Sequence, residues 1–326
     1  MSEKPNRLRE IKRSIRRHRR QLLSPLSRLL VNSGVERIAE RLGIITPMVV
    51  KLMDGGLASQ MIMFAKGYHY AKERNLPLYL DLEWFNRCGR DVSGNQNRPF
   101  HLFEIFPEIK EQYSDKVIKT PGVFQFLFTD VKPNGDTVEE LPPRSLFLKA
   151  YGGELPCLIE HIDDMKRFFR YGVEMSAEEQ QLAHDIDTSH SCALHVRKGD
   201  FVGSVHDVCT DKYYLEAISK MRSLVPDCTF YVFTNDETYV RDMLNGEEGH
   251  FVYMTNRSEA QPAVDMWLMQ RCKHAIISNS GFSLVPAILS YSKDKEVILP
   301  SRWSNKERGA ENAKANQLPG WTVIDC

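Results

Sequence analysis

No two cysteines in the sequence have CxxC spacing, and the number of cysteines, seven, is odd. Disulfide frameworks and structural zinc sites require paired or closely spaced cysteines. No cluster of His, Cys and Asp has metal-ligand spacing along the chain. We therefore expect reduced thiols, a cytoplasmic protein, no metal site and no bound cofactor.

Long apolar runs are also missing. No stretch reaches the roughly 18 apolar residues that a membrane-spanning helix needs, and the basic N-terminus has no apolar core of the kind found in secretory signals. The 43 basic residues balance the 43 acidic ones, so no net positive field recruits nucleic acid. A chain of 326 residues with ordinary composition is long enough for two lobes.

Charge is unevenly placed near the start of the chain. Residues 4–20 contain nine Lys or Arg and a single acid. Leucines and isoleucines recur between them at roughly helical spacing, so residues 4–24 are a candidate contact with an anionic membrane, at its inner face. A solvated tail without a partner is the other interpretation. Either way, residues 1–46 are expected to form a basic, partly helical tail.

Strands and helices alternate along the rest of the chain. Predicted strands at 48–53 and 76–82 flank a glycine turn and a helix over 60–75. This βαβ order favours a parallel sheet. Residues 83–165 are rich in turn residues and show a less regular pattern of strands and helices. Residues 177–187 are predicted to form a polar helix. In the second half, strands are predicted at 192–196, 228–236, 250–256 and 296–300, with helices over 211–225, 238–245 and 262–274 between them. Residues 275–283 are predicted to contain a strand, a turn and the start of a helix.

The hexapeptide His195-Val-Arg197-Lys198-Gly199-Asp200 follows one of the predicted strands directly. The planar donor fork of Arg197 suits phosphate oxygens, and Gly199 lets the backbone approach a ligand. An ion pair that orders a surface turn explains the same residues equally well. The hexapeptide alone leaves both interpretations open.

Two glycine- or serine-rich turns lie between predicted strands and helices. In residues 54–60, Gly55 and Gly56 present backbone N–H groups at a helix start, a common anion site, although tight turns use glycine anyway. In residues 278–283, serine hydroxyls and backbone N–H groups fit phosphate binding or plain helix capping, which do not exclude each other. Asp265 is either a carboxylate acceptor for a guanine edge or a first-turn acid favoured by the helix dipole.

Seven stretches occur in the order and with the spacing of a known family. They are MDGGLASQM, LYLDLEWF, HVRKGD, HDVCTDKYYLEAI, FYVFTND, VDMWLMQRCKHAIISNSGFS and VILPSRW, and they span about 250 residues from Met48 to Trp303. In this order they resemble the bacterial branch of the α-1,2-fucosyltransferases, a glycosyltransferase family 11-like group that also contains the animal blood-group H enzymes.

The resemblance implies an α/β fold of the GT-B type, with two Rossmann-like lobes facing across a cleft. The N-terminal lobe is expected at residues 47–175 and lies on the acceptor side. The C-terminal lobe is expected at residues 176–326 and binds the GDP-sugar. The resemblance implies that His195 and Asp265 contact guanine, that Arg197 meets the diphosphate, and that Asp200 orients Arg197 or Lys198. The full set of candidate donor-binding residues is His195, Arg197, Lys198, Asp265, Ser280, Gly281, Phe282, Ser283, Gly55, Gly56, Ser59 and Gln60. The candidate catalytic residues are Arg197, Asp200, Asp54 and His206, with Asp54 and His206 as alternative bases.

The implied reaction is an inverting, metal-independent transfer of L-fucose from GDP-β-L-fucose to the 2-hydroxyl of a galactose-type residue. The acceptor is expected to be a bacterial surface glycan, in a lipid-linked form if the basic tail lies on the membrane. Lys198, Ala58, Ser59 and Gly281 depart from the family pattern. These departures keep two alternatives open: another GDP-sugar donor, or a non-catalytic membrane- or polyanion-binding protein with a degenerate transferase fold.

Overall fold

The computed structural model describes residues 41–43, 46–87, 98–118, 146–148, 155–254 and 262–326, so nearly all of the predicted basic tail lies outside the described residues. Internal contacts divide the chain into two units that change over between Glu160 and His161, with residues 56–62 and 101–110 belonging to the second unit. The predicted lobe boundary between 175 and 176 stays a prediction. Within the described part of the chain, no helix combines the length and apolarity needed to cross a membrane.

The first unit is built on a four-stranded parallel sheet with the order β3-β2-β1-β4. Its strands are β1 (Val49–Leu52), β2 (Leu78–Asp81), β3 (Val117–Ile118) and β4 (Leu146–Leu148). Helix α3 (Leu57–Arg74) links β1 to β2. Gly67 allows α3 to pack closely on this sheet, because a Cβ there would lie 2.9 Å from Leu78 Cδ1 and 3.0 Å from Lys51 Cβ. The short helices α4 (Glu83–Arg87) and α7 (Leu155–Glu160) also belong to this unit.

The second unit has a six-stranded parallel sheet with the order β10-β9-β8-β5-β6-β7. Its strands are β5 (Ser191–Val196), β6 (Thr229–Thr234), β7 (His250–Tyr253), β8 (His274–Ile276), β9 (Val297–Pro300) and β10 (Thr322–Ile324). The chain therefore starts in the middle at β5, winds outward to β7, and returns to the middle at β8. This is a doubly wound order, and the boundary between β5 and β8 is its topological switch point.

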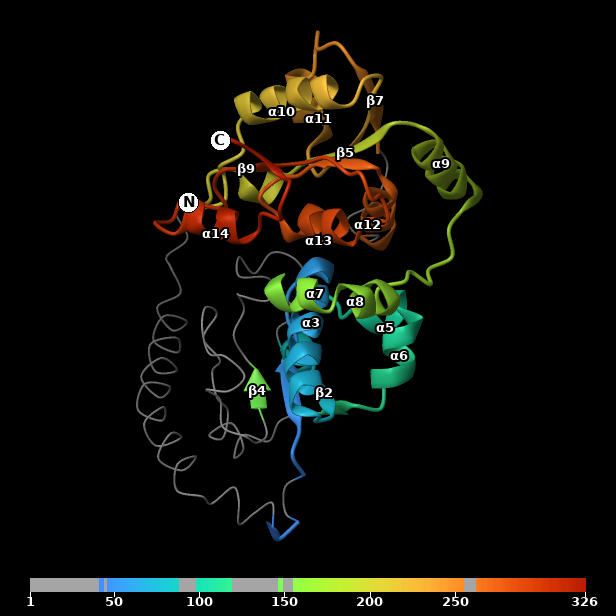
Figure 1. Cartoon of the computed structure of the whole chain (residues 1–326), viewed down its shortest axis with the longest axis vertical. Coiled ribbons are helices and arrows are strands. Elements are labelled where there is room, and N and C mark those ends of the chain that lie inside the picture. The colour runs from blue at the N-terminus through green and yellow to red at the C-terminus, as the bar shows by residue number, and fades with distance from the viewer. Residues whose placement is uncertain (1–40, 44–45, 88–97, 119–145, 149–154, 255–261) are drawn as a thin grey trace, which may run out of the picture. The chain divides into compact units, whose positions relative to one another are not determined.

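Helices cover both faces of this sheet, with α10 (Asp211–Leu224) and α11 (Glu237–Met243) on one face and α12 (Pro262–Arg271) and α13 (Gly281–Leu289) on the other (Figure 1). The remaining helices assigned wholly to this unit are α5 (Leu102–Ile105), α8 (Ile162–Phe168), α9 (Ala177–Thr188) and α14 (Gly309–Ala315). Helix α6 (Pro107–Tyr113) contributes its first residues to this unit and its last to the other. The core under α10 contains Tyr213, Tyr214, Met221 and Phe230, all without solvent exposure.

The predicted strands and helices of the second half are all present, with boundaries within a few residues of those expected. Alternating apolar strands and amphipathic helices make such a pattern readable, because both faces of a parallel sheet are buried. The positions of the short helices between 83 and 165 were not predicted, and neither were strands β3, β4 and β10. Each has seven residues or fewer, too few for a clear periodicity.

Candidate active site

His195 connects the two strands that meet at the switch point. It lies near the carboxyl end of β5, and its Nδ1 is 2.8 Å from Ser278 Oγ and 2.9 Å from Ser283 Oγ. Ser278 follows β8, and Ser283 lies in the first turn of α13. Ligands bind in doubly wound folds outside the carboxyl ends of the strands at this point. The hexapeptide and the serine-rich turn, which begin 83 positions apart in sequence, therefore form one site.

His195 is almost fully buried, with 3% of its surface exposed. Burial, with a smaller contribution from the charge of Arg197, lowers the pKa of His195 to about 3. The imidazole is therefore neutral at physiological pH and adds no positive charge to the site. Any charge that meets an anion here comes from Arg197 and the start of α13.

Arg197 and Asp200 form a close ion pair at the end of β5. Arg197 Nη2 donates to Asp200 Oδ2 at 2.9 Å, and Arg197 Nε lies 2.8 Å from Asp200 Oδ1. The guanidinium also lies over the ring of Phe201, 5.5 Å from its centre. The ion pair that orders the turn is therefore present and also fixes the plane of the guanidinium, whereas the binding of an anion by Arg197 stays a prediction.

Gly199 gives the turn its shape. Its φ of +44° is in the left-handed region, and a Cβ at this position would lie 2.5 Å from Asn235 Nδ2. Asn235 in turn donates to Asp200 Oδ1 at 3.4 Å and accepts from Lys198 N at 2.9 Å. The loop after β6 therefore supports the loop after β5.

Lys198 directs its ammonium group into the protein. Its Nζ donates to the backbone oxygen of Cys209 at 2.9 Å, lies 3.5 Å from Asp207 Oδ1, and sits 4.8 Å above the ring centre of Tyr239. The residue is only 9% exposed. These contacts of the Lys198 ammonium group stabilise the loop between β5 and α10. The predicted contact of Lys198 with the sugar donor stays a prediction.

The first turn of α13 is capped as the serine-rich pattern indicates. Ser280 Oγ accepts from Phe282 N at 3.2 Å, and Ser283 Oγ lies 3.3 Å from the backbone oxygen of Ser280. Phe282 places its ring 5.7 Å from the His195 ring, centre to centre. Gly281 lies close to the first turn of α3, since a Cβ there would lie 3.6 Å from Ala58 Cβ.

Asn279 ties three segments together, and the sequence assigned it no role. Its Nδ2 donates to the backbone oxygens of His206 at 2.9 Å and Trp303 at 3.0 Å, and its Oδ1 accepts from Cys209 Sγ at 3.4 Å. The residue is 3% exposed. It stands in the serine-rich turn between β8 and α13, but only the folded chain shows that its amide reaches both other loops.

The glycine turn after β1 is divided between the two units. Asp54 and Gly55 belong to the first unit, whereas Gly56, Ser59 and Gln60 are grouped with the second. Gln60 is fully buried, and its Oε1 accepts from His101 N at 2.8 Å. This contact holds backbone rather than a ligand, and the predicted donor contacts of the turn stay predictions.

The two other predicted residues of the second unit lie on different segments. Asp265 is partly buried in the first turn of α12, which packs against α13. His206 is exposed on the loop between β5 and α10, with its ring 5.3 Å from that of Phe201. His206 is therefore accessible to solvent on the same loop system as Arg197.

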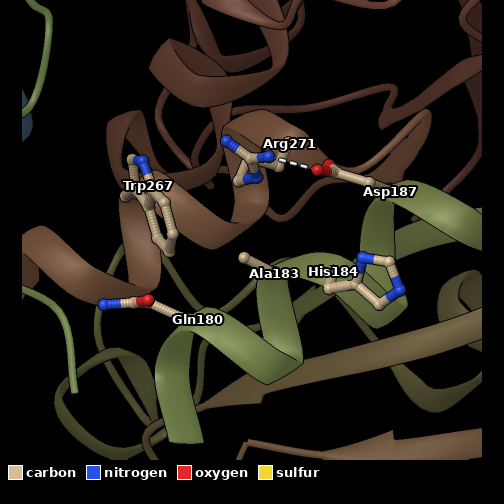
Figure 2. Close-up of a pocket in the computed structure, with 6 residues that line it drawn as sticks. All are labelled: Gln180, Ala183, His184, Asp187, Trp267 and Arg271. Carbon is tan, nitrogen blue, oxygen red and sulfur yellow. Dashed lines mark hydrogen bonds and ion pairs between the residues drawn. The ribbon is translucent and has the colours of Figure 1, made fainter. Parts of the chain in front are cut away.

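A shallow pocket of about 290 Å³ lies elsewhere in the second unit, between α9 and α12. Figure 2 shows Trp267 and the Arg271–Asp187 ion pair on its rim, with Gln180, Ala183 and His184 along α9. None of the predicted site residues lines it. The pocket is therefore separate from the site at the switch point.

Potential metal ligands gather at another place among the described residues. His69, Glu73 and Glu160, all in the first unit, offer ligand atoms that lie within 4.8 Å of one another. The spacing of residues along the chain does not reveal this group, because its two halves come from distant segments. None of its members is a predicted donor-site residue.

A doubly wound parallel sheet with an arginine, a neutral histidine and a capped helix start at its switch point defines an α/β protein whose second unit has a candidate ligand site at the carboxyl ends of its strands. Residues 161–325 match the model of the family described as Glycosyl transferase family 11. The chain belongs to this family, as the ordered motifs predicted. Five of the seven motifs lie within the matched residues, and the two around β1, α3 and β2 lie before them.

Two curated relatives from Escherichia coli are similar over most of their length. The first, an alpha-1,2-colitosyltransferase, is 27% identical over 281 residues, which cover 80% of this chain and 93% of the relative. The second, the O-antigen biosynthesis glycosyltransferase WbnK, is 24% identical over 291 residues, which cover 77% and 93%.

A solved structure shares the fold. The NodZ alpha-1,6-fucosyltransferase soaked with GDP-fucose has a TM-score of 0.51 at 16% identity and covers 75% of this chain and 93% of its own. At this identity the similarity supports the fold alone.

Proposed function

We propose that this protein transfers L-fucose from GDP-β-L-fucose to the 2-hydroxyl of a galactose-type residue, forming an α-1,2 linkage in a bacterial surface glycan. The observation that carries the proposal is the hydrogen bonding of His195 to Ser278 and Ser283 at the switch point, beside Arg197. Membership of a transferase family favours an enzyme over the non-catalytic alternative.

The reaction breaks the bond between the anomeric carbon and the β-phosphate and forms a bond to the acceptor oxygen from the opposite face. The leaving diphosphate gains negative charge, which preorganised donors stabilise. In the proposed arrangement Arg197, held in plane by Asp200, faces the β-phosphate. The N–H groups at the start of α13, in the turn that carries Ser280, add the positive end of the helix dipole. These groups supply the role that a metal ion fills elsewhere, so the proposed transfer is metal-independent.

The acceptor hydroxyl loses its proton to a base. Asp54, after β1, and His206, on the loop that follows β5, remain the two candidates. Replacement of the true base, as Asp54→Asn or His206→Gln, lowers kcat by roughly 100-fold or more while GDP affinity stays unchanged. Replacement of the other residue leaves kcat within a few-fold.

A second donor has specific support. One of the most similar relatives is a colitosyltransferase, and colitose differs from L-fucose by the absence of the 3-hydroxyl. A pocket that reads this hydroxyl with a buried polar group discriminates strongly between the two sugars, whereas an apolar pocket does not.

The test is a transfer assay on the purified full chain in excess EDTA, with GDP-fucose, GDP-colitose and GDP-mannose as donors and a β-galactoside as acceptor. Product mass and linkage are read by mass spectrometry and NMR. We expect transfer of fucose with α-1,2 linkage at least about tenfold faster than transfer of colitose. Faster transfer of colitose would overturn the donor assignment, and loss of turnover in EDTA would overturn metal independence.

The membrane role of the tail is a separate proposal that rests on sequence. Residues 4–24 carry a high density of Lys and Arg, which favours binding to anionic lipid. Co-sedimentation with vesicles of phosphatidylglycerol should exceed that with phosphatidylcholine, and deletion of residues 1–24 should remove the difference. Equal binding to both kinds of vesicle would contradict a membrane role for residues 4–24 and would favour the interpretation as a solvated tail.

A further inference from the structure

Helices α3 and α7 of the first unit bring together an imidazole and two carboxylates that the transfer reaction does not use. His69 and Glu73 stand four residues apart near the end of α3, so they share one face of the helix. Glu160 is the last residue of α7. The three residues of the first unit leave the fourth position of a tetrahedral zinc ion to water.

The spacing of the ligand atoms suits a small tetrahedral ion. His69 Nδ1 lies 3.4 Å from Glu160 Oε2, and ligand atoms of His69, Glu73 and Glu160 lie within 4.8 Å of one another. Two ligands at about 2.0–2.2 Å from a tetrahedral zinc ion are about 3.3–3.6 Å apart. The His69–Glu160 pair therefore already has the separation of one edge of a zinc site.

Charge points the same way. Glu73 and Glu160 are both exposed and place carboxylate oxygens within 4.8 Å of each other, a repulsion that water weakens and that a bound cation would turn into attraction. A dication neutralises both carboxylates. Mixed imidazole and carboxylate ligands favour Zn²⁺ and its transition-metal neighbours over Mg²⁺ and Ca²⁺, which take oxygen ligands alone.

We propose that His69, Glu73 and Glu160 form a zinc site that fastens α7 to α3. Helix α7 has only six residues, too few to be stable without tertiary contacts. It packs through Leu155, Cys157 and Leu158, which are buried, while Glu160 is exposed. Zinc binding adds a second attachment of α7, at its last residue, beside these apolar contacts. The site has a structural role and takes no part in sugar transfer.

The experiment uses the full chain without a polyhistidine tag, stripped of metal by a chelator and returned to chelator-free buffer. Titration with ZnCl₂ is followed by calorimetry, and titration with CoCl₂ by visible absorption, because four-coordinate Co²⁺ absorbs far more strongly than six-coordinate Co²⁺. We expect saturable binding of one Zn²⁺ per chain, the strong four-coordinate Co²⁺ spectrum, and a rise of several degrees in the thermal midpoint with excess Zn²⁺.

Two variants and a matched control assign the ligands. His69→Gln and Glu160→Gln should each reduce zinc affinity at least about tenfold and remove the Co²⁺ band, with circular dichroism showing that they fold. His184→Gln removes an exposed imidazole on α9 and should bind zinc like the wild type. The proposal would be overturned if the wild-type protein bound no zinc. It would also be overturned if the two folded variants bound zinc with the affinity of the wild type. Transfer activity is unaffected in either case, so the outcome is independent of the proposed reaction.

Discussion

His195 Nδ1 lies 2.9 Å from Ser283 Oγ, a residue 88 positions later in the chain. This contact, with its partner contact to Ser278, connects the carboxyl end of β5 to the first turn of α13 through a buried imidazole. The site depends on His195 staying neutral, because a charged imidazole in this position would be buried beside the guanidinium of Arg197.

The stability of the protein should therefore fall in mild acid. Burial lowers the pKa of His195 to about 3 in the folded state, whereas the unfolded chain titrates near 6.5. Between these values the unfolded chain binds a proton that the folded protein does not bind. The contribution of His195 is complete above pH 6.5 and is lost as the pH falls toward 3, by about 1.4 kcal/mol per pH unit.

Urea unfolding at pH 7.5, 6 and 5 measures this dependence. His195→Asn should flatten the decline between pH 6 and 5 by about 1 kcal/mol, and His184→Gln, which removes an exposed histidine, should not. Equal slopes for His195→Asn and the wild type would show that His195 is not the group responsible.

Arg197 should determine GDP affinity more than stability. Arg197→Ala removes charge-assisted hydrogen bonds to phosphate, each of which contributes about 1.5–3 kcal/mol, so GDP affinity should fall at least about tenfold by calorimetry. Arg197→Lys should fall between the two because it keeps the charge but loses the planar fork. Arg222→Ala, which breaks an exposed ion pair with Glu248, is the control. Unchanged GDP affinity in Arg197→Ala would remove Arg197 from the site.

Asn279 should be essential for stability. Asn279→Ala leaves the backbone oxygens of His206 and Trp303 without the donor that they have in the native protein. Unsatisfied buried groups cost about 1–3 kcal/mol each, so the free energy of unfolding should fall by at least about 2 kcal/mol. Asn245→Ala, at an exposed position, should change it by less than about 0.5 kcal/mol. A loss for Asn279→Ala no larger than for the control would contradict the role of this amide.

In contrast to Arg197, Lys198 should determine the stability of the protein more than its affinity for GDP. Lys198→Met keeps the length of the side chain but leaves the Cys209 carbonyl and Asp207 without the ammonium group. We expect a loss of about 1–3 kcal/mol in stability and a change in GDP affinity of less than about threefold. A large loss of GDP affinity in a stable variant would instead place Lys198 at the donor, as the resemblance to the family implied.

The sequence by itself determined the fold class and the family. Apolar strands alternate with amphipathic helices. This pattern can be recognised from the sequence alone, because both faces of a parallel sheet must be covered. The motifs also located the loops that carry Arg197 and Ser280. Local chemistry was sufficient for these predictions, since an arginine beside a glycine after a strand and a serine before a helix each have a local physical reason to be there.

The tertiary structure decided how those residues are used. Whether Lys198 faces a ligand or the interior depends on where Cys209 and Tyr239 lie. Whether the Asn279 amide can donate to two other loops depends on how those loops, which are far from it in sequence, are placed. The grouping of His69 with Glu160 depends on where the end of α7 lies relative to α3. Such contacts arise only when distant segments are brought together by burial of the sheets, and periodicity along the chain carries no information about them.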